Sequence, residues 1–421
     1  MEDLDVIILG AGAAGLSAAA ALSQSQLRYI VLEARDRIGG RIYSQEKKEL
    51  GAELIHGDSA SLLAFSKPRT LSVENLDLPS IGLWGGREIA AADYQKRVDK
   101  VSDGLKLLDR ETSVAQYLES LQGGVDDETL FFARQFFEGF NAASLDQMGT
   151  GSLEQIAGEQ ESLERLNEGY GAFVENLRAS VKGEVRLGWK VREVQWGHNR
   201  VKVRAMTSLT TPAAQFTAKV ALVTFPLSVL KGNSPATVKF QPALDMKKSA
   251  LERLEIGPVL KLCLKFEKGF PEKVGFGKKW TLMLASQEEP FHVFWWGPKG
   301  TDSIIAWAGG PKAKALASFA PEQKQSLALD CLARTLVLPT EEVHGKFKQM
   351  FWHDWQADPF SGGAYSYGGL GGKTAFAELA QPVNETLFFA GEATHPTKNG
   401  TVAGAVESGQ RAAKEIMKVL W

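Results

Sequence analysis

Three glycines near the N-terminus have the spacing of a phosphate-binding turn. Gly10, Gly12 and Gly15 form G-x-G-x-x-G between an apolar run and a segment of small residues that begins with Ala13 and Ala14. The first glycine permits a tight turn, the second lets a pyrophosphate approach the backbone, and the third lets helix and strand pack closely. The N-terminus of the following helix then offers N–H groups and partial positive charge to the phosphates. The pattern predicts a dinucleotide site, with an ordinary glycine-rich turn as the alternative.

A charged loop after the next apolar run could complete the dinucleotide site. Glu33 ends that run at the place where a ribose-binding carboxylate belongs, and Ala34 follows it. Two adjacent glycines, the second of which is Gly40, let the backbone come close to a ligand. Arg35 and Arg41 can offset pyrophosphate charge with forked hydrogen bonds. The alternative is a solvated charged loop, and these residues alone could serve NAD as well as FAD.

The elements that must position these groups begin as a β-α-β unit. Val6–Leu9 and Tyr29–Leu32 are short apolar runs, typical of buried parallel strands, and a helix is expected between them from about Ala13 to Ser23. From about residue 80 to residue 180, apolar positions at helical spacing predict a mostly helical region. Its clearest helical segments are Val101–Leu108, Val114–Leu121 and Leu130–Phe140.

Strands return after residue 180. A meander of three strands is expected, with His198-Asn199 as the turn between the last two strands. These strands are Val185–Leu187, Val191–Trp196 and Val201–Ala205. The later elements that the pattern predicts are strands at Val220–Thr224, Val259–Phe266 and Leu387–Ala390, and helices at Pro321–Leu336 and about Thr401–Leu420.

This order of elements predicts an α/β protein of two domains. Residues 1–75, 181–245 and 380–421 are expected to form a Rossmann-like FAD-binding domain assembled from discontinuous segments. Residues 76–180 and 246–379 are expected to form an inserted substrate-binding domain of the α+β type, with a mixed sheet and helices.

Composition excludes several classes of partner. The formal net charge of −2 provides no overall field that would attract nucleic acid or an anionic membrane. The chain shows neither a signal-peptide pattern nor a run approaching 18 apolar residues. Cys263 and Cys331 lack C-x-x-C or metal-like spacing, which favours two free thiols in a reducing compartment and no metal site. We therefore expect a cytoplasmic protein, and both a monomer and a homodimer stay open.

Several motifs, in a fixed order, resemble those of the flavin amine oxidases, which include monoamine and polyamine oxidases and their histone-demethylase relatives. Residues 33–41 resemble the family's second signature, and residues 51–57 are similar to a polyamine-oxidase stretch that carries an active-site histidine. Residues 222–227 resemble the strand that leads out of the flavin domain. Residues 387–392 and 400–405 resemble the C-terminal flavin signature. The resemblance covers most of the chain, and residues 60–150 match only loosely.

The resemblance implies FAD and assigns cofactor contacts near the C-terminus. Glu392, which follows Gly391, would contact the ribityl chain of the flavin. The helix that begins near Thr401 and Val402 would point its N-terminus at the pyrimidine end of the flavin, where negative charge develops on reduction. An ordinary glycine-rich helix start is the alternative. Since NAD lacks a flavin ring, these segments favour FAD.

Two further cofactor contacts and the mode of attachment also follow from the resemblance. Val191 would meet the adenine through its backbone, and Trp355 would pack near the ring system unless it is a plain core aromatic. Ala364 stands where monoamine oxidases have a cysteine linked to the flavin, so FAD is expected to be non-covalent. Tyr365 would form one wall of an aromatic cage. Thr401 stands at the position of the second cage tyrosine, so the cage would be incomplete.

Two residues besides Tyr365 are candidates for catalysis. Lys261 lies in an apolar strand, where a lysine is costly unless it is paired or neutralised. The resemblance places it beside the flavin N5, holding a water molecule. Alternation puts Lys261 on the same face as Val259 and Cys263, so periodicity does not decide whether it points inward or outward. His56 could orient a substrate nitrogen, or it could be a satisfied core histidine.

Candidate substrate contacts are Glu53, Glu138 and Thr401, and a solvated glutamate is an equal alternative for Glu138. Trp295 and Trp296 are expected to pack in the sheet, with a role in lining the pocket as the alternative. The expected reaction is oxidation of an amine: a hydride passes from the α-carbon to the flavin N5, the imine is hydrolysed, and O₂ reoxidises the flavin to give H₂O₂.

The substrate is expected to be a polyamine or another primary or secondary amine, while a monoamine or an amino acid stays open. Two other classes of function are alternatives. One is a flavin dehydrogenase or desaturase acting on an apolar substrate, and the other is a catalytically silent FAD-binding scaffold.

Overall fold

The computed structural model describes residues 4–57, 59–76, 78, 80–153, 163–208, 212–274, 280–297 and 301–421. The chain divides into two compact units. The first unit comprises Met1–Glu74, Glu161–Ile256 and Ala357–Trp421, and the second comprises Asn75–Gln160 and Gly257–Gln356. No helix in the described part of the chain has both the length and the apolarity that crossing a membrane requires.

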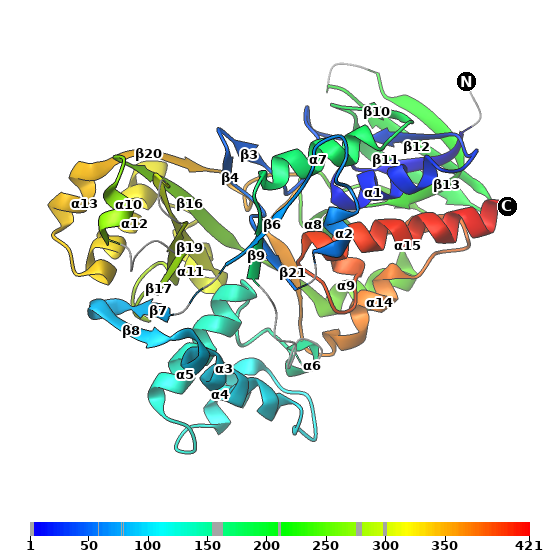
Figure 1. Ribbon diagram of the computed structural model, residues 1–421. Coiled ribbons are helices and arrows are strands. Elements are labelled where there is room, and N and C mark those ends of the chain that lie inside the picture. The colour runs from blue at the N-terminus through cyan, green and yellow to red at the C-terminus, as the bar shows by residue number, and fades with distance from the viewer. Residues whose placement is uncertain are drawn as a thin grey trace. The chain divides into compact units, whose positions relative to one another are not determined.

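The first unit contains strands from all three of its segments (Figure 1). Its elements are β1 (Leu4–Leu9), α1 (Ala13–Leu22), β2 (Tyr29–Leu32), β3 (Ser44–Gln45), β4 (Lys48–Glu49), β5 (Leu54–His56), α2 (Ala60–Leu63), β6 (Val73–Asn75), β9 (Leu163–Leu166), α7 (Gly169–Ala179), β10 (Glu184–Arg186), β11 (Lys190–Gly197), β12 (Arg200–Met206), β13 (Ala214–Val223), α8 (Leu227–Leu230), β14 (Lys239–Gln241), α9 (Asp245–Arg253), β15 (Leu254–Gly257), β21 (Tyr365–Gly368), η3 (Gly372–Thr374), α14 (Ala375–Ala380), β22 (Leu387–Phe389), η4 (Glu392–Thr394) and α15 (Val402–Leu420).

The main sheet of the first unit has the order β10-β2-β1-β13-β12-β11-β14, and β22 also pairs with β13. The strands β10, β2, β1, β13 and β22 run parallel, while β11, β12 and β13 form the antiparallel meander. The predicted meander is therefore wrong in its first strand, because β10 pairs in parallel with β2 and the third meander strand is β13. The parallel start β1-α1-β2 confirms the predicted nucleotide-binding architecture. The strand predicted at Val220–Thr224 is longer than expected because the first half of β13 pairs with β12.

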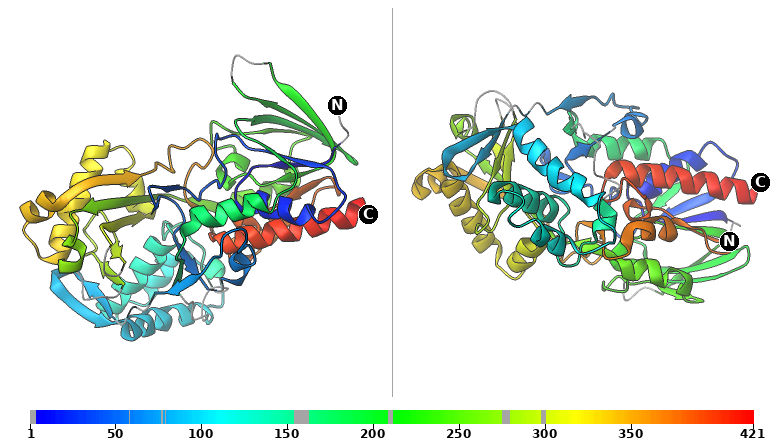
Figure 2. Two further views of the ribbon diagram at one scale, coloured as in Figure 1. Left: turned by 45° about the horizontal axis from the view of Figure 1, so that its top comes forward. Right: turned by 90° about the horizontal axis from the view of Figure 1, so that it is seen from below.

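Alternate residues of the parallel strands are buried on opposite faces of this sheet. Ile8 and Val31 pack toward α1, α7 and α15, whereas Ile7 and Leu32 pack against the apolar side chains of the meander. The views in Figure 2 agree that β11 and β12 lie on the other side of β1 and β2 from α1 and α15. Burial on both faces explains why these strands read as continuous apolar runs rather than as alternating ones.

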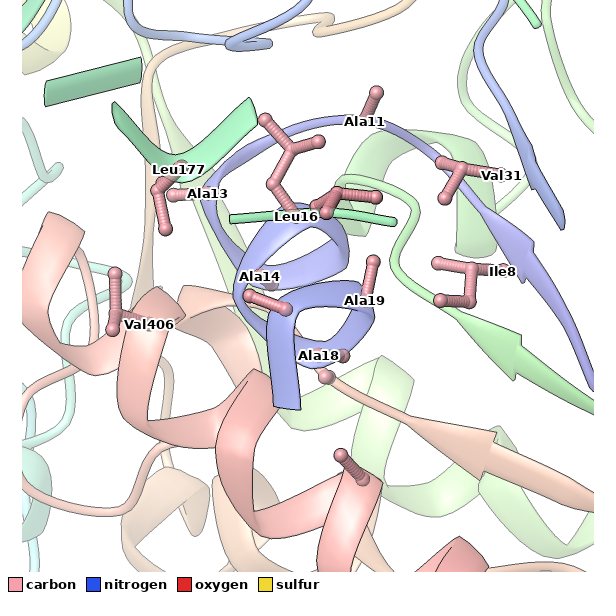
Figure 3. Packing of buried hydrophobic residues seen from close by; sticks show 14 of the residues in the cluster. Ile8, Ala11, Ala13, Ala14, Leu16, Ala18, Ala19, Val31, Leu177 and Val406 are labelled. Carbon is pink, nitrogen blue, oxygen red and sulfur yellow. The ribbon is translucent and has the colours of Figure 1, made fainter. Parts of the chain in front are cut away.

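Small residues let α1 and α15 pack closely (Figure 3). Ala14 and Ala18 of α1 belong to the same buried cluster as Val406 of α15. The hydroxyl of Ser17 donates to the carbonyl of Val406 at 2.9 Å, so the helices are bonded as well as packed. A Cβ atom at Gly409 would lie 2.2 Å from the carbonyl oxygen of Ala14, so this crossing requires glycine.

The second unit is built on a mixed sheet with the order β20-β16-β19-β18-β17-β7-β8. Its elements are β7 (Ser80–Leu83), η1 (Trp84–Gly86), β8 (Arg87–Ala90), α3 (Ala91–Leu105), α4 (Val114–Ser120), α5 (Asp127–Arg134), η2 (Gln135–Phe140), α6 (Thr150–Leu153), β16 (Val259–Phe266), α10 (Phe270–Val274), β17 (Thr281–Leu284), β18 (Val293–Trp296), β19 (Ser303–Gly309), α11 (Gly310–Leu316), α12 (Pro321–Leu336), α13 (Thr340–Lys346) and β20 (Phe347–Trp352).

Two features of the predicted helical region need correction. Residues 80–90 form the hairpin β7–β8, in which Ile81 and Ile89 are paired across a turn that contains Gly85 and Gly86. Glycines between alternating apolar residues are a hairpin signal that outweighs helical spacing. The helix expected at Leu130–Phe140 changes character after Arg134, and its last residues form the π-helical turn η2.

Three segments, residues 161–180, 246–256 and 357–379, lie in a different unit from the predicted one. Residues 161–180 belong to the first unit because α7 packs Phe173 and Leu177 into the same cluster as α1. Residues 357–379 belong there too because β21 pairs with β15, and because Phe376 of α14 packs with Ala250 of α9. A pattern of helices and strands does not state which sheet an element covers, so such boundaries depend on tertiary packing.

Candidate functional site

The glycine-rich turn of the first unit is shaped by two steric requirements. Gly10 has φ +115°, and a Cβ atom there would lie 2.6 Å from Oγ1 of Thr224. A Cβ atom at Gly15 would lie 2.0 Å from the carbonyl oxygen of Gly10, which is far inside contact distance. Gly12 is the N-cap of α1 and has no side chain that could occupy the first N–H groups. The turn therefore presents the N-terminus of α1 to an anionic ligand.

The second glycine pair lies against this turn. Gly39 donates its N–H to the carbonyl of Ala11 at 2.9 Å, and Gly39 forms a parallel bridge with Gly12. A Cβ atom at Gly40, which has φ +60°, would lie 3.3 Å from the Cα atom of Gly12. The two glycine motifs, separate in the sequence, thus form one surface of bare backbone. Such a surface fits a pyrophosphate, which needs close approach to N–H groups.

Glu33 lies directly after β2 and is 4% exposed. Its Oε2 atom accepts the Ala11 N–H at 2.7 Å and its Oε1 atom accepts the Arg35 N–H at 2.8 Å. These bonds fix the carboxylate between the glycine turn and the charged loop. An ionised carboxylate has about four acceptor positions, so two ribose hydroxyls could still bind.

The arginines of the charged loop have partners that the sequence does not indicate. Nη2 of Arg35 donates to Asp358 at 2.7 Å and to Ser361 at 2.9 Å. Nη1 of Arg37 donates to the carbonyl of Ile42 at 3.2 Å, while its Nη2 atom is buried and has no hydrogen-bond partner among the described residues. Burial lowers the pKa of Arg37. A buried guanidinium nitrogen without an acceptor fits an anion such as pyrophosphate.

Glu392 joins three segments of the first unit through its carboxylate. Its Oε1 atom accepts from Nη1 of Arg41 at 2.8 Å, and the same nitrogen donates to the carbonyl of Ala364 at 2.6 Å. Its Oε2 atom accepts from the Ser366 hydroxyl at 2.6 Å and from the Gly400 N–H at 2.8 Å. The side chain of Glu392 is 6% exposed, so these charge-assisted bonds lie largely out of water.

The N-terminus of α15 is partly capped from within. Oγ1 of Thr401 accepts the Gly404 N–H at 2.9 Å and donates to the carbonyl of Lys398 at 2.8 Å. The Thr401 side chain takes the N–H group of the third helical position, so the N–H groups that the helix start can offer a ligand are those of Val402 and Ala403. Their N–H groups and the helix dipole remain suited to a developing negative charge.

Tyr365 opens β21 beside these segments. A Cβ atom on Gly400 would lie 3.4 Å from Cδ2 of the tyrosine ring, so the ring lies against bare backbone. Burial, together with the charge of Glu392, raises the pKa of the Tyr365 hydroxyl, which therefore stays protonated. The preceding residue, Ala364, has only a methyl group and offers no thiol.

His56 ends β5, which pairs with β9, and Glu53 is a partly buried residue just before that strand. Burial lowers the pKa of His56 to about 4, so its imidazole is neutral at ordinary pH. Val191 begins the buried part of β11 and is 7% exposed within the core that faces the meander.

Lys261 lies in the second unit, on the face of its sheet that is opposite to the main core. Leu260 and Leu262 belong to that core, while Lys261 pairs with Trp307 and shares its face. The Nζ atom of Lys261 is 5.9 Å from the ring centre of Trp295, and the lysine is 3% exposed. The structure thus resolves what alternation left open, because the lysine is buried beside aromatic rings. Trp296, in contrast, packs in the core.

Glu138 and Trp355 also lie in the second unit. Glu138 lies in the π-helical turn, and its carboxylate is 3.3 Å from Nε2 of His292, which is 3% exposed. Because Nδ1 of His292 accepts the Gly309 N–H at 3.3 Å, the proton of the neutral ring lies on Nε2 and faces Glu138. Trp355 is 3% exposed and its ring contacts His353 edge to face, with centres 4.3 Å apart.

The predicted site residues divide between the two units of the structure. The structure brings Gly10, Gly12, Gly15, Glu33, Gly40, Arg41, Tyr365, Gly391, Glu392, Thr401 and Val402 into the first unit, with His56, Glu53 and Val191. It places Lys261, Glu138 and Trp355 in the second unit. Sequence reasoning missed Asp358, Ser361 and Ser366, which hold the predicted charged residues. No local spacing rule links residues that lie so far apart in the chain.

Comparison with known proteins finds a matching protein family and several similar proteins. Residues 83–417 match the family described as flavin containing amine oxidoreductase, and residues 8–67 match the NAD(P)-binding Rossmann-like domain. Polyamine oxidase 3 of Oryza sativa subsp. japonica is 29% identical over 98% of this chain and 89% of its own length. Lysine-specific histone demethylase 2 of Homo sapiens is 27% identical over 98% of this chain and 53% of its own length. A solved structure of putrescine oxidase bound to putrescine has a TM-score of 0.81 at 20% identity, over 99% of both chains.

Proposed function

The chain belongs to the flavin-containing amine oxidoreductases, and from this premise we propose that it is an FAD-dependent oxidase of polyamines or related primary and secondary amines. The observation that carries the proposal is the carboxylate of Glu392. It connects the charged loop, β21 and the start of α15 within one unit. Its bonds therefore unite the segments that the sequence assigns to FAD.

We propose that FAD is held by contacts alone. The bare backbone of Gly12 and Gly40 and the N-terminus of α1 would take the pyrophosphate, and Glu33 would take the ribose. Ala364 offers no thiol for a covalent bond. When bound, FAD accepts a hydride from the carbon next to an amine nitrogen and passes the electrons to O₂, which yields H₂O₂.

The remaining candidates have roles that fit their chemistry. His56, neutral at ordinary pH, can donate to or accept from an uncharged amine nitrogen. Tyr365, held protonated, supplies an aromatic wall. We propose that Lys261 acts in catalysis, that Trp355 contacts the cofactor, and that Glu53, Glu138 and Thr401 are contacts for the substrate. The polyamine class rests on similarity to the rice polyamine oxidase and on the motif around His56.

A second candidate function is oxidation of a methylated lysine side chain in a peptide. The similarity to the human lysine-specific histone demethylase supports it, although this chain spans only about half of that relative. Both candidates remove a hydride from a carbon bonded to an amine nitrogen, so they differ in the substrate and not in the residues that bind FAD.

An anaerobic reduction screen separates these candidates. The purified holoenzyme is mixed with spermine, spermidine, putrescine, an aromatic monoamine, an amino acid or a methyl-lysine peptide, and the flavin absorbance is followed. We expect a polyamine to bleach the flavin fastest, and air to restore the colour with release of H₂O₂. Bleaching only by the peptide would favour demethylation. No bleaching by any amine would refute the proposed function.

A further inference from the structure

The segment between η4 and α15 is held by an imidazole with a defined proton position. Nδ1 of His395 accepts the Lys398 N–H at 2.9 Å and the Thr397 N–H at 3.4 Å. A ring nitrogen that accepts N–H groups carries no proton, so in the neutral ring the proton lies on Nε2. Nε2 is 3.1 Å from a carboxylate oxygen of Glu407, which lies in α15. The imidazole thus joins the loop to the helix.

This loop positions two groups of the proposed FAD site. The carbonyl of Lys398 accepts the hydroxyl of Thr401, the N-cap of α15, at 2.8 Å. The Gly400 N–H donates to Glu392 at 2.8 Å. A Cβ atom at Gly404 would lie 2.1 Å from the Lys398 carbonyl oxygen, so the loop lies directly on the first turn of the helix. A change in the loop would therefore reach both Glu392 and the helix start.

Burial favours the neutral form of His395, and the charges around the ring act in both directions. Lys398 of the same loop pairs with Glu407 at 2.6 Å, so the carboxylate is shared between the ammonium and the imidazole. Burial lowers the pKa of His395, the Glu407 carboxylate opposes that effect, and the positive charges of Lys398 and Arg411 add to it. Protonation of Nδ1 would remove the acceptor for both backbone N–H groups.

We propose that His395 is a positioning residue for FAD, which acts by holding the loop that presents the Gly400 N–H to Glu392 and the Lys398 carbonyl to Thr401. The inference rests on the proposed FAD site and extends it to a residue that makes no direct contact in that proposal. It predicts that the acceptor at Nδ1, rather than the bulk of the ring, supports FAD binding.

Two substitutions separate the acceptor from the bulk. In His395→Asn, the side-chain oxygen can accept N–H groups two and three residues along the chain, as in Asx turns. In His395→Leu, the bulk remains and the acceptor is lost. We expect the leucine variant to raise the dissociation constant of FAD by about tenfold or more at pH 8, and the asparagine variant to stay within about twofold of the wild type. His198→Asn, an exposed histidine in the meander turn, is the matched control and should leave FAD binding unchanged.

Two further readouts distinguish positioning from general stability. The wild type should lose FAD affinity as the pH falls from 6.5 to 5, because the loop requires an unprotonated Nδ1, whereas His395→Asn should not show this additional loss. The midpoint potential of bound flavin should become more negative in His395→Leu and recover in His395→Asn.

Equal FAD affinity in His395→Leu and the wild type would overturn the proposal, as would equal pH dependence in His395→Asn and the wild type. If the leucine variant does not fold, the second comparison still decides. Amine turnover is measured on the same preparations. Wild-type protein that binds FAD but oxidises no amine would refute the oxidase and leave the role of His395 intact.

Discussion

The substitution Glu392→Gln tests whether one carboxylate organises the proposed FAD site. Glutamine keeps the shape of the side chain but replaces one acceptor oxygen with an NH₂ donor and removes the charge. One oxygen of Glu392 accepts from Arg41 and the other accepts from Ser366 and Gly400. Whichever way the amide turns, its NH₂ group faces at least one N–H donor.

The expected loss of stability in Glu392→Gln follows from the hydrogen bonds that the substitution removes. A hydrogen bond to a charged group contributes about 1.5–3 kcal/mol, and a donor left facing another donor costs more. Arg41 is 27% exposed, so water can replace part of its interaction with Glu392. The ion pair therefore adds little to the expected loss of stability. We therefore expect a loss of about 2–3 kcal/mol in the free energy of unfolding, which lowers the Tm of the first unit by roughly 5–10 °C.

The assay is thermal unfolding of the holoenzyme, followed by the rise in flavin fluorescence at one fixed scan rate. Glu415→Gln is the matched control because its partner Arg411 lies four residues earlier on α15 and both side chains are about a third exposed. Such a helical pair contributes only about 0.3–0.5 kcal/mol, so the control should melt close to the wild type. If Glu392→Gln also melts within about 2 °C of the wild type, the carboxylate does not organise the site.

Three other predictions follow from the same structure. Gly15→Ala should raise the dissociation constant of FAD more than about tenfold because its Cβ would lie 2.0 Å from a backbone oxygen, whereas Gly197→Ala, with open space around it, should bind FAD normally; equal affinities would contradict this. The free energy of unfolding of the wild type should fall by up to about 3 kcal/mol between pH 6.5 and pH 4, because the pKa of His56 is about 4 in the folded protein and lies below its value in the unfolded chain. In denaturant titrations, the free energy of unfolding of His56→Gln should fall less over this pH range. The same pH dependence in the variant and the wild type would refute the assignment of this loss to His56. Acid precipitation should leave a yellow supernatant, since Ala364 offers no thiol, and a yellow pellet would exclude non-covalent FAD.

Local sequence patterns were sufficient to predict many of the helices and strands. The helix Pro321–Leu336 and the strands at Tyr29–Leu32 and Val259–Phe266 have the predicted bounds. Their ends are fixed by nearby residues, such as the proline at the first position of the helix. The missed hairpin β7–β8 also had a local signal, because Gly85 and Gly86 separate alternating apolar residues.

Local sequence patterns could not predict the ion-pair partners of the charged residues. Arg35 binds Asp358, which lies 323 residues away, and Arg41 binds Glu392, which lies 351 residues away. A sequence states that an arginine is present near a phosphate-binding turn, but only the packed chain decides which carboxylate reaches it. For the same reason, the pattern around Lys261 could not choose a face, and the choice came from the leucines that form the core on the other side.

The bonds of Glu392 explain why segments that are remote in sequence act as one site. A helix start can stabilise negative charge only if its N–H groups are held in place, and here Thr401 and Gly400 are held through the loop and the carboxylate. Arg41 links the same carboxylate to the loop of Gly40, which lies against the glycine turn. Each contact therefore fixes the position of the next. The affinity for FAD should depend on the connected set of residues more than on the sum of its separate contacts.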